Sequence, residues 1–345
     1  MRKKIFLGAY INVINAQNLN CKSIAFHLDK NKYSVKALVL GDKNIKKLND
    51  VSLIKISTFR YKTSNLFAFI KGVLWADVCY FPKHQSTPKL ALKIANLLDK
   101  KIFTTIEGNM CDTSKKSMIE SFGTLENMKS HFSMIPNVFG ITPHLILSSH
   151  CGVLINKNPL FLGVDKNNFK NKGVVKNKVE NLVFIGSLIK RKNLNDILDL
   201  AKHFKNITFN IIGDGPLKDE LENKSTTNVN FFGKLNSYEI SNHLQNMDLH
   251  ILLSRSEGFP KVILETASSA IPSILYDDYG ADSWINHSVN GFVVSTFEEV
   301  TSTINNLIEN PELLIRNSEN VLELAEKFDW KIIIKSWEKV IDNLK

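Results

Sequence analysis

Short apolar runs alternate with amphipathic stretches through both halves of the chain. In the first half the runs predict strands at Lys4–Ala9, Val35–Leu40, Val78–Phe81 and Ile102–Ile106, with another near Leu145–Ser148. In the second half they predict strands at Leu182–Ile185, Ile207–Ile212, Val229–Phe232, Leu249–Leu253, Ser273–Tyr276 and Gly291–Val294. Apolar runs of this length, separated by amphipathic helices, are typical of parallel sheets covered on both faces. The pattern predicts an α/β protein with two Rossmann-like domains that face each other across a cleft.

The domain boundaries follow from a change in composition. Residues 166–181 are polar, rich in Lys and Asn and without periodicity, as expected of an interdomain linker. We therefore expect one domain at residues 1–165 and a second at 182–329. Apolar residues recur through residues 330–345 and predict a final helix, which we expect to pack back toward the first domain.

Two features of the first half have simple structural interpretations. The stretch Lys89–Leu98 follows Pro88 and carries Leu90, Ile94, Leu97 and Leu98 at helical spacing. Such a stripe more often faces a core than a membrane, so we expect it to be buried. His84 lies at the carboxyl end of a predicted strand, where it either lines a site or, more simply, is solvated.

Composition describes an ordinary globular protein, with 43% hydrophobic and 23% charged residues. The four cysteines are far apart and form no CxxC motif, which favours reduced thiols, a cytosolic protein and no structural zinc. The N-terminus resembles a signal peptide, but Asn12, Asn15 and Gln17 interrupt the apolar run, so we assign it to the first strand. No apolar stretch is long enough to span a bilayer.

Charge is distributed unevenly. Residues 1–150 contain 22 Lys and Arg against nine Asp and Glu, a net charge of +13, whereas the remaining 195 residues have a net charge of −3. A basic half suggests an anionic partner such as an acidic membrane surface or a phosphate-bearing acceptor. A bias toward Lys codons would give the same count. Nucleic acid is the weakest candidate, because no nucleic-acid motif is present and the aromatic residues lie within apolar runs.

Two carboxylates, Glu257 and Glu265, flank the turn after the predicted strand Leu249–Leu253. Gly258 and Pro260 break the strand, and a helix is expected to follow. Glu257 should therefore lie in the loop at the carboxyl end of a parallel strand, where open α/β sheets bind ligands. Glu265 should lie about two turns into the helix, whose N-terminus suits a phosphate. For either Glu alone, a favourable interaction with the helix dipole is the simpler interpretation.

Short motifs follow one another in a fixed order through the second half. They are Gly163-Val-Asp165 with Phe169, Gly186-Ser-Leu-Ile-Lys-Arg-Lys192, Gly213-Asp-Gly-Pro216, Phe232-Gly233, Ser254-Arg-Ser-Glu-Gly-Phe-Pro260, Glu265, Pro272 and Val289-Asn-Gly-Phe292. On these motifs the chain resembles the retaining glycosyltransferases of the GT-B fold, in particular the family-4 group with a glutamate–seven residues–glutamate motif. The match covers most of residues 160–345. The first half shows only the generic topology, as such a family's acceptor domain would.

The resemblance implies that the second domain binds a UDP- or GDP-linked sugar. It implies that Glu265 holds the ribose hydroxyls, that Glu257 lies near the donor sugar, and that Lys192 neutralises the departing diphosphate. Further donor contacts are expected from Gly258, from the backbone N–H groups of Phe259, Lys261 and Val262, and from Leu235 beside the nucleobase.

The chain departs from the family pattern at three positions. Ser187 replaces the usual arginine. Arg191 or Lys190 could supply the missing positive charge; the alternative is that both are ordinary solvent-exposed residues. Glu107 stands where many relatives have a histidine that reaches the donor sugar; a carboxylate can accept a hydroxyl hydrogen bond or act as a base, but it cannot replace a cation. Gly8 stands alone where a glycine pair is usual. It either lets the backbone approach a phosphate or an acceptor, or is an ordinary turn glycine.

Taken together, these features predict a retaining glycosyltransferase with Glu257, Lys192 and Glu107 as catalytic residues. No metal or other cofactor is expected, because no Asp-x-Asp motif occurs. The expected acceptor is a lipid-linked or growing surface polysaccharide, with the enzyme in the cytoplasm or peripheral at the cytosolic membrane face. The alternatives are a non-catalytic nucleotide-sugar-binding partner and a sugar-nucleotide epimerase of the GT-B fold.

Overall fold

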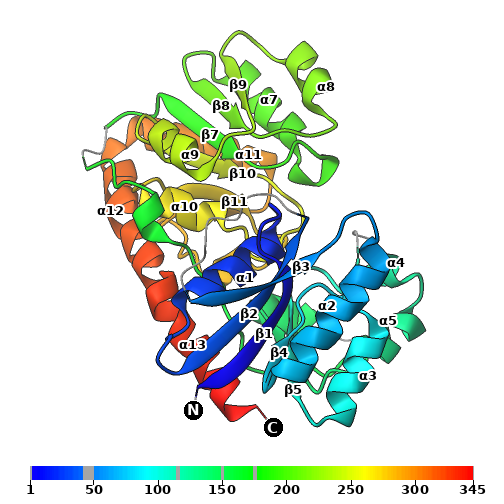
Figure 1. Cartoon of the computed structure of the whole chain (residues 1–345). Coiled ribbons are helices and arrows are strands. Elements are labelled where there is room, and N and C mark those ends of the chain that lie inside the picture. Colours follow the sequence, from blue (N-terminus) through cyan, green and yellow to red (C-terminus); the bar gives the residue numbers. More distant parts are fainter. Residues whose placement is uncertain (1, 42–49, 114–116, 149–150, 174–176, 345) are drawn as a thin grey trace. The chain divides into compact units, whose positions relative to one another are not determined.

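The computed structural model consists of two compact units, each with its own parallel sheet (Figure 1). It describes the chain except residues 1, 42–49, 114–116, 149–150, 174–176 and 345. Unit 1 comprises Met1–Gly163 and Trp330–Lys345, and unit 2 comprises Val164–Asp329. No helix in the described part of the chain is long and apolar enough to cross a membrane.

Unit 1 contains a six-stranded parallel sheet in the order β3-β2-β1-β4-β5-β6. Its strands are β1 (Lys3–Tyr10), β2 (Tyr33–Leu40), β3 (Val51–Ile56), β4 (Val78–Tyr80), β5 (Lys101–Ile106) and β6 (Asn137–Gly140). Its helices are α1 (Ala16–His27), α2 (Tyr61–Trp75), α3 (Lys89–Leu97), α4 (Met118–Phe122), α5 (Leu125–Phe132), α6 (Pro143–Ser148) and α13 (Trp330–Asn343). The strand predicted near Leu145–Ser148 is wrong, because a helix begins there at Pro143. The short strands β3 and β6 were not predicted.

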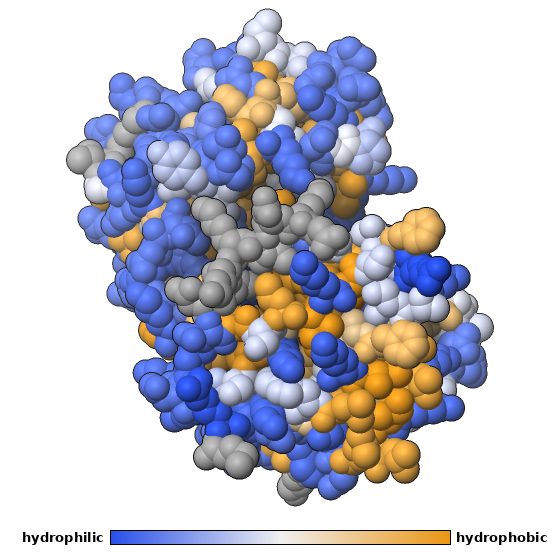
Figure 2. Space-filling model, viewed as in Figure 1, coloured by the Kyte–Doolittle hydropathy of each residue, from blue (hydrophilic) through white to orange (hydrophobic). Residues whose placement is uncertain are grey.

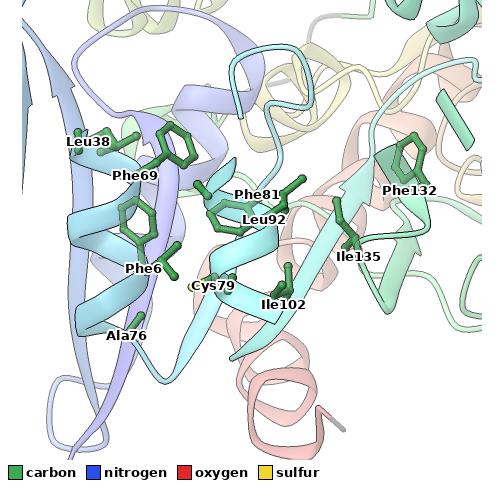
Figure 3. Close-up of a cluster of buried hydrophobic side chains, with 14 of the residues drawn as sticks. Phe6, Leu38, Phe69, Ala76, Cys79, Phe81, Leu92, Ile102, Phe132 and Ile135 are labelled. Carbon is green, nitrogen blue, oxygen red and sulfur yellow. The ribbon is translucent and has the colours of Figure 1, made fainter. Parts of the chain in front are cut away.

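Aromatic side chains form the centre of the unit 1 core. Phe6 on β1, Phe69 on α2 and Phe81 after β4 lie with ring centroids 5.7 to 6.0 Å apart (Figure 3). Gly8 belongs to this core, since a Cβ there would lie 2.7 Å from Phe81 and 2.9 Å from Phe69. The structure therefore corrects both expectations for Gly8. It is neither a turn residue nor exposed to a ligand, and its missing side chain makes room for two rings.

Helix α3 turns a different face to the core from the one expected. Ala91, Leu92 and Ala95 are buried, whereas Leu90, Leu97 and Leu98 are exposed. The prediction that the leucine stripe is buried is wrong, because small alanines allow the opposite face of α3 to pack closely.

Two of the four cysteines are paired. Cys111 and Cys151 form a disulfide that joins the segment after β5 to the segment after α6. The expectation of reduced thiols is wrong for this pair. The sequence did not reveal the disulfide, because the two residues lie 40 positions apart and no spacing motif marks them. Cys21 and Cys79 are free and buried, as expected of reduced thiols.

Unit 2 contains a second six-stranded parallel sheet, in the order β12-β11-β10-β7-β8-β9. Its strands are β7 (Asn181–Ile185), β8 (Thr208–Ile212), β9 (Val229–Gly233), β10 (Leu249–Leu252), β11 (Ser273–Tyr276) and β12 (Phe292–Val294). Its helices are η1 (Lys166–Asn168), η2 (Lys190–Lys192), α7 (Leu194–His203), α8 (Lys218–Lys224), α9 (Ser237–Leu244), α10 (Val262–Ser268), η3 (Ala281–Ser283), α11 (Phe297–Glu309) and α12 (Pro311–Lys327). All six strands predicted for this half are confirmed.

The first part of the expected linker packs on unit 2. Phe169 is buried, the Lys170 N–H donates to Ser241 Oγ (3.1 Å), and Gln245 Nε2 donates to the Lys170 carbonyl (2.8 Å). Lys166 also forms an ion pair with Glu326. These contacts differ from those of a free connector, because one apolar side chain and backbone hydrogen bonds hold the polar segment to α9 and α12.

His84 and His131 are both buried in unit 1, with ring centroids 5.4 Å apart. Burial and the neighbouring His131 lower the pKa of His84 to about 3, and burial with the charge of Lys89 lowers the pKa of His131 to about 4. Neither ring is solvated, so the simpler expectation for His84 is wrong. Both rings are neutral in the folded protein at neutral pH.

Acidification should destabilise unit 1 through these rings. In the unfolded chain both histidines are protonated as the pH drops below about 6.5, whereas in the folded protein they stay neutral until a lower pH. The free energy of unfolding therefore falls as the pH drops from about 6.5 toward 4. His84→Asn should therefore flatten the dependence of Tm on pH in this range. Thermal unfolding of both proteins across the range tests this, and an equally steep dependence in His84→Asn would contradict it.

Candidate functional site

The candidate site lies where the strand order of unit 2 reverses. From β7 the chain proceeds outward to β8 and β9, and from β10 it proceeds the other way to β11 and β12, so β7 and β10 are central neighbours. Open α/β sheets bind ligands outside the carboxyl ends of strands at this switch point. Lys192 follows β7 on η2, and Glu257 follows β10 in the loop before α10.

Lys192 and Glu257 form a buried ion pair. Lys192 Nζ lies 2.6 Å from Glu257 Oε1, and the two side chains are only 10% and 9% exposed. The residues are 65 positions apart in the sequence, so the fold brings them together. In this environment an unpaired charge would be costly, so Glu257 stabilises the buried charge of Lys192.

Arg191 contacts the same carboxylate. Its Nη1 lies 2.8 Å from Glu257 Oε1 and also donates to the Ser256 carbonyl. The Arg255 N–H donates in turn to the Arg191 carbonyl at 3.4 Å. Arg191 thus ties η2 to the loop after β10, whereas Lys190 is exposed.

The charged groups of this cluster shift one another's pKa values. Burial alone would raise the pKa of Glu257, but the charges of Lys192 and Arg191 and their hydrogen bonds outweigh burial and hold it below its usual value. Burial lowers the pKa of Lys192, and Glu257 opposes that shift. Below the pair, burial and the charge of Lys192 lower the pKa of His250 to about 3. The cluster therefore has an ionised carboxylate between two cations above a neutral histidine.

A glycine turn supports the η2 loop from behind. A Cβ on Gly213, at φ +149°, would lie 1.8 Å from the Gly186 carbonyl oxygen, and one on Gly215 would lie 2.5 Å from the Leu188 carbonyl oxygen. The Leu188 N–H donates to the Asp214 carbonyl at 3.0 Å. Only glycines allow this close backbone approach. Ser187 lies in this loop between β7 and η2, and it is exposed.

Glu265 lies nearer the start of α10 than expected. The helix begins at Val262, so Glu265 is in its first turn, and its N–H donates to the Lys261 carbonyl at 3.0 Å. The expectation of two turns is wrong, because Pro260 precedes the helix instead of opening it. Glu265 is half-buried; burial raises its pKa and the charge of Lys261 opposes this.

The remaining donor-side residues have different environments. Phe259 is buried against Trp284 and Phe328, with centroids 5.1 and 5.3 Å away. Gly258, Lys261 and Val262 are half-buried around the start of α10. Leu235 is half-buried between β9 and α9, and β8 separates β9 from β7, so it stands apart from the ion pair along the sheet.

Glu107 belongs to a polar network of unit 1. It follows β5 and accepts hydrogen bonds from Asn20 Nδ2 (3.0 Å) and Thr105 Oγ1 (3.3 Å). Thr105 also lies 2.6 Å from the Tyr80 hydroxyl. The carboxylate is half-buried and accepts these two hydrogen bonds, and a carboxylate oxygen can equally accept from a hydroxyl of a ligand.

One residue of the site had no predicted role. The Arg255 guanidinium lies 3.9 Å from the centroid of the Tyr276 ring and 2.9 Å from Asp278. The Tyr276 hydroxyl donates to Asp196 at 2.8 Å. Arg255 belongs to the motif Ser254–Pro260. Its position two residues before Glu257 is the feature of the sequence that could have marked it as a site residue. Among the described residues, no group of three or more His, Cys, Asp or Glu side chains is arranged to hold a metal ion.

The second unit matches a family model. Residues 165–323 match the family described as Glycosyl transferases group 1. This matched region contains Lys192, Glu257 and Glu265. An Acholeplasma laidlawii alpha-monoglucosyldiacylglycerol synthase is 24% identical over 259 residues, which cover 72% of this chain and 60% of the relative.

Further relatives are also glycosyltransferases by name. The Escherichia coli UDP-Gal:alpha-D-GlcNAc-diphosphoundecaprenol alpha-1,3-galactosyltransferase is 29% identical over 166 residues, 42% of this chain and 43% of the relative. An uncharacterized glycosyltransferase of Haemophilus influenzae is 26% identical over 178 residues, 48% of this chain and 50% of the relative. The chain thus spans about half the length of several curated relatives that it matches.

Solved structures share the fold over the whole chain. Anabaena HepE in complex with UDP and glucose has a TM-score of 0.77 and 17% identity, with all of both chains covered. The sucrose-phosphate synthase of Thermosynechococcus elongatus has a TM-score of 0.79 and 13% identity, with 99% of each chain covered. The two parallel sheets and these likenesses confirm the expected GT-B fold class.

The ion pair predicts unequal effects on stability. Glu257→Gln leaves two cations together and should lower the free energy of unfolding by about 2–4 kcal/mol. Lys192→Met leaves Glu257 paired with Arg191 and should cost less, about 1–2 kcal/mol. The exposed Lys190→Met is the control, with an effect within about 0.5 kcal/mol. Denaturant unfolding measures all three, and a larger loss for Lys192→Met than for Glu257→Gln would contradict this arrangement.

The glycine turn predicts a steric effect. Gly213→Ala should force the turn away from Gly186 and lower the free energy of unfolding by at least about 2 kcal/mol. Gly108→Ala is the control, because its Cβ would meet no atom within 4 Å. Thermal unfolding compares them, and equal Tm values would show that the close approach is unimportant.

Proposed function

We propose that the chain is a retaining glycosyltransferase that moves a sugar from a UDP- or GDP-linked donor to a hydroxyl acceptor. The buried Lys192–Glu257 ion pair at the switch point of unit 2 is the observation that carries the proposal. A nucleotide diphosphate needs cations and hydrogen-bond donors, whereas a sugar needs acceptors, and this pair offers both in one place.

Lys192 has the central role in this proposal. In the free protein its charge is balanced by Glu257, which opposes the lowering of the Lys192 pKa by burial. When a donor binds, Lys192 turns to the diphosphate, and Glu257 keeps Arg191 as a partner while accepting from hydroxyls of the donor sugar. The exchange places one fixed cation where negative charge develops on the leaving group.

The half-buried Glu265 is proposed to accept hydrogen bonds from the ribose diol. Its first-turn position on α10 and its raised pKa mean that a partly desolvated carboxylate stands ready for two hydroxyl donors. Donor contacts are also proposed for Ser187, Arg191, Gly258 and Leu235, and for the backbone N–H groups of Phe259, Lys261 and Val262.

The reaction is proposed to occur on one face of the sugar. The bond from the anomeric carbon to the phosphate oxygen breaks, the acceptor oxygen bonds to the same face of that carbon, and the acceptor proton passes to the departing diphosphate. Lys192 and backbone donors stabilise this diphosphate without a metal ion. Glu107 is proposed to orient the acceptor by accepting a hydrogen bond from one of its other hydroxyls, so that the attacking hydroxyl keeps its proton for the diphosphate.

The acceptor is proposed to be lipid-linked or a growing surface polysaccharide. The relatives named above include a diacylglycerol glucosyl synthase and an enzyme of a diphosphoundecaprenol-linked sugar, and an Erwinia amylovora relative is named for amylovoran biosynthesis. Such an acceptor places the reaction at the cytosolic face of a membrane. The net charge of +13 on residues 1–150 supports this location.

Ligand binding and turnover together test the proposal. UDP or GDP should raise Tm, because a ligand that binds only the native state stabilises it, while CMP should have little effect. Lys192→Met should lose sugar transfer by at least about 100-fold, as expected when a charge on the leaving group is removed. Lys190→Met should retain transfer.

The outcomes separate this function from its alternatives. A nucleotide-induced rise in Tm with neither transfer nor hydrolysis across a broad donor panel would favour a non-catalytic binding partner. Interconversion of the donor sugar without an acceptor would favour an epimerase. No response to any nucleotide would contradict all three.

A further inference from the structure

Helices α2 and α3 of unit 1, together with Phe59 just before α2, expose large apolar side chains, which we call the α2–α3 face. Phe59 is 90% exposed, Phe67 69%, Leu74 59%, Leu90 49% and Leu97 85%. Figure 2 shows a corresponding hydrophobic area over the region where Figure 1 places these helices. Isolated exposed apolar residues are common on protein surfaces, but a contiguous patch usually marks an interaction site.

The helical spacing aligns these residues. On α2, Phe67 and Leu74 are seven positions apart on one side, with the exposed Lys71 between them. On α3, Leu90 and Leu97 are likewise seven apart, and α2 and α3 pack against each other. Both helices already bury their other sides in the core. The outer sides therefore form one surface and are not needed for folding unit 1.

Charge distinguishes this surface from an ordinary apolar patch. Between residues 51 and 98 the sequence has seven Lys and Arg residues and a single acidic one, Asp77. Asp77 accepts a hydrogen bond from the Lys4 N–H at the amino end of β4. Neither α2 nor α3 contains an acidic residue. Five of the basic residues are exposed on or directly before these helices, namely Arg60, Lys62, Lys71, Lys89 and Lys93.

The mixture of side chains favours lipid over protein as the partner. Lysine is depleted from the centres of protein interfaces, yet Lys71 lies between Phe67 and Leu74, and Lys93 between Leu90 and Leu97. At a bilayer surface the same arrangement is favourable, because apolar side chains enter the acyl boundary while long lysines reach anionic headgroups. In unit 2 the large exposed apolar residues, such as Phe232, Tyr238 and Ile308, lie on separate elements.

From these observations we infer that the α2–α3 face docks on an anionic membrane surface, with Phe59, Phe67, Leu74, Leu90 and Leu97 entering it and the neighbouring lysines binding headgroups. The inference deepens the proposed function, since it gives unit 1 a means of reaching a lipid-linked acceptor. The docking itself requires no sugar transfer, so the two proposals can fail independently.

Cosedimentation of the full chain with vesicles tests the docking. The protein should sediment with vesicles of phosphatidylcholine and phosphatidylglycerol at low salt, and a much smaller fraction should sediment with pure phosphatidylcholine vesicles. Phe67→Ser with Leu97→Ser should lower partitioning at least about tenfold, because two large apolar contacts are lost. Lys71→Ser with Lys93→Ser should lower it by a similar factor and weaken its salt dependence, since each basic residue contributes about fivefold.

A matched control lies on the other side of the same sheet, where Figure 1 places α1 and α13. Phe26→Ser with Ile332→Ser also removes one exposed aromatic and one exposed aliphatic residue, and it should bind vesicles as the wild type does. Equal loss in control and test variants, or no binding of the wild type to anionic vesicles, would overturn the inference. So would self-association that the Phe67 and Leu97 changes abolish, without vesicle binding. The rise in Tm with UDP or GDP should be the same in every variant.

Discussion

The ion pair between Lys192 and Glu257 is the constraint on which the candidate site depends. Removing either charge from water costs several kcal/mol, so Lys192 depends on Glu257 there, while Glu257 depends on the two cations Lys192 and Arg191. The pair therefore fixes η2 against the loop after β10, and Arg191 strengthens the same junction through Ser256. Because β7 and β10 are the central strands, the charged cluster lies at the middle of the sheet, with paired strands on both sides.

The same constraint explains the small residues around the site. The turn at Gly213 packs directly against Gly186 at the start of the loop that carries Lys192, a contact that any Cβ on Gly213 would prevent. Phe259, packed on Trp284 and Phe328, anchors the other loop just beyond Glu257. Flexible charged side chains thus stand on loops whose backbones are fixed, as a preorganised site for a leaving group requires.

The sequence predicted unit 2 better than unit 1, for physical reasons. Fully buried strands such as β10 give unmistakable apolar runs. The resemblance gave Lys192 and Glu257 separate donor-side roles, but no pattern in the sequence predicted the ion pair between them. Glu265 was misplaced by several residues because a proline before a helix and one in its first turn look alike in sequence. Gly8 was misassigned because only the rings of Phe69 and Phe81, distant in sequence, reveal why a side chain is excluded there. The Cys111–Cys151 pair likewise depends on long-range packing.

The leucine stripe of α3 shows the converse error. Amphipathic periodicity identifies the apolar side of a helix, but it does not say whether that side meets a protein core or another apolar medium. Here Ala91 and Ala95 supply the packing side, and the larger leucines are left outside. Unit 1 thus combines a polar network around Glu107 with a basic, apolar outer surface, whereas unit 2 has a buried ion pair at the end of its central strands.

A crystal structure of the protein with UDP bound would test the central claim most directly, through the distance from Lys192 Nζ to the nearest atom of the diphosphate. The account predicts that Lys192 leaves Glu257 and lies within hydrogen-bond distance of a phosphate oxygen, while Arg191 stays on Glu257 and Glu265 contacts the ribose. UDP bound elsewhere, or at the site with the Lys192–Glu257 pair intact, would contradict it.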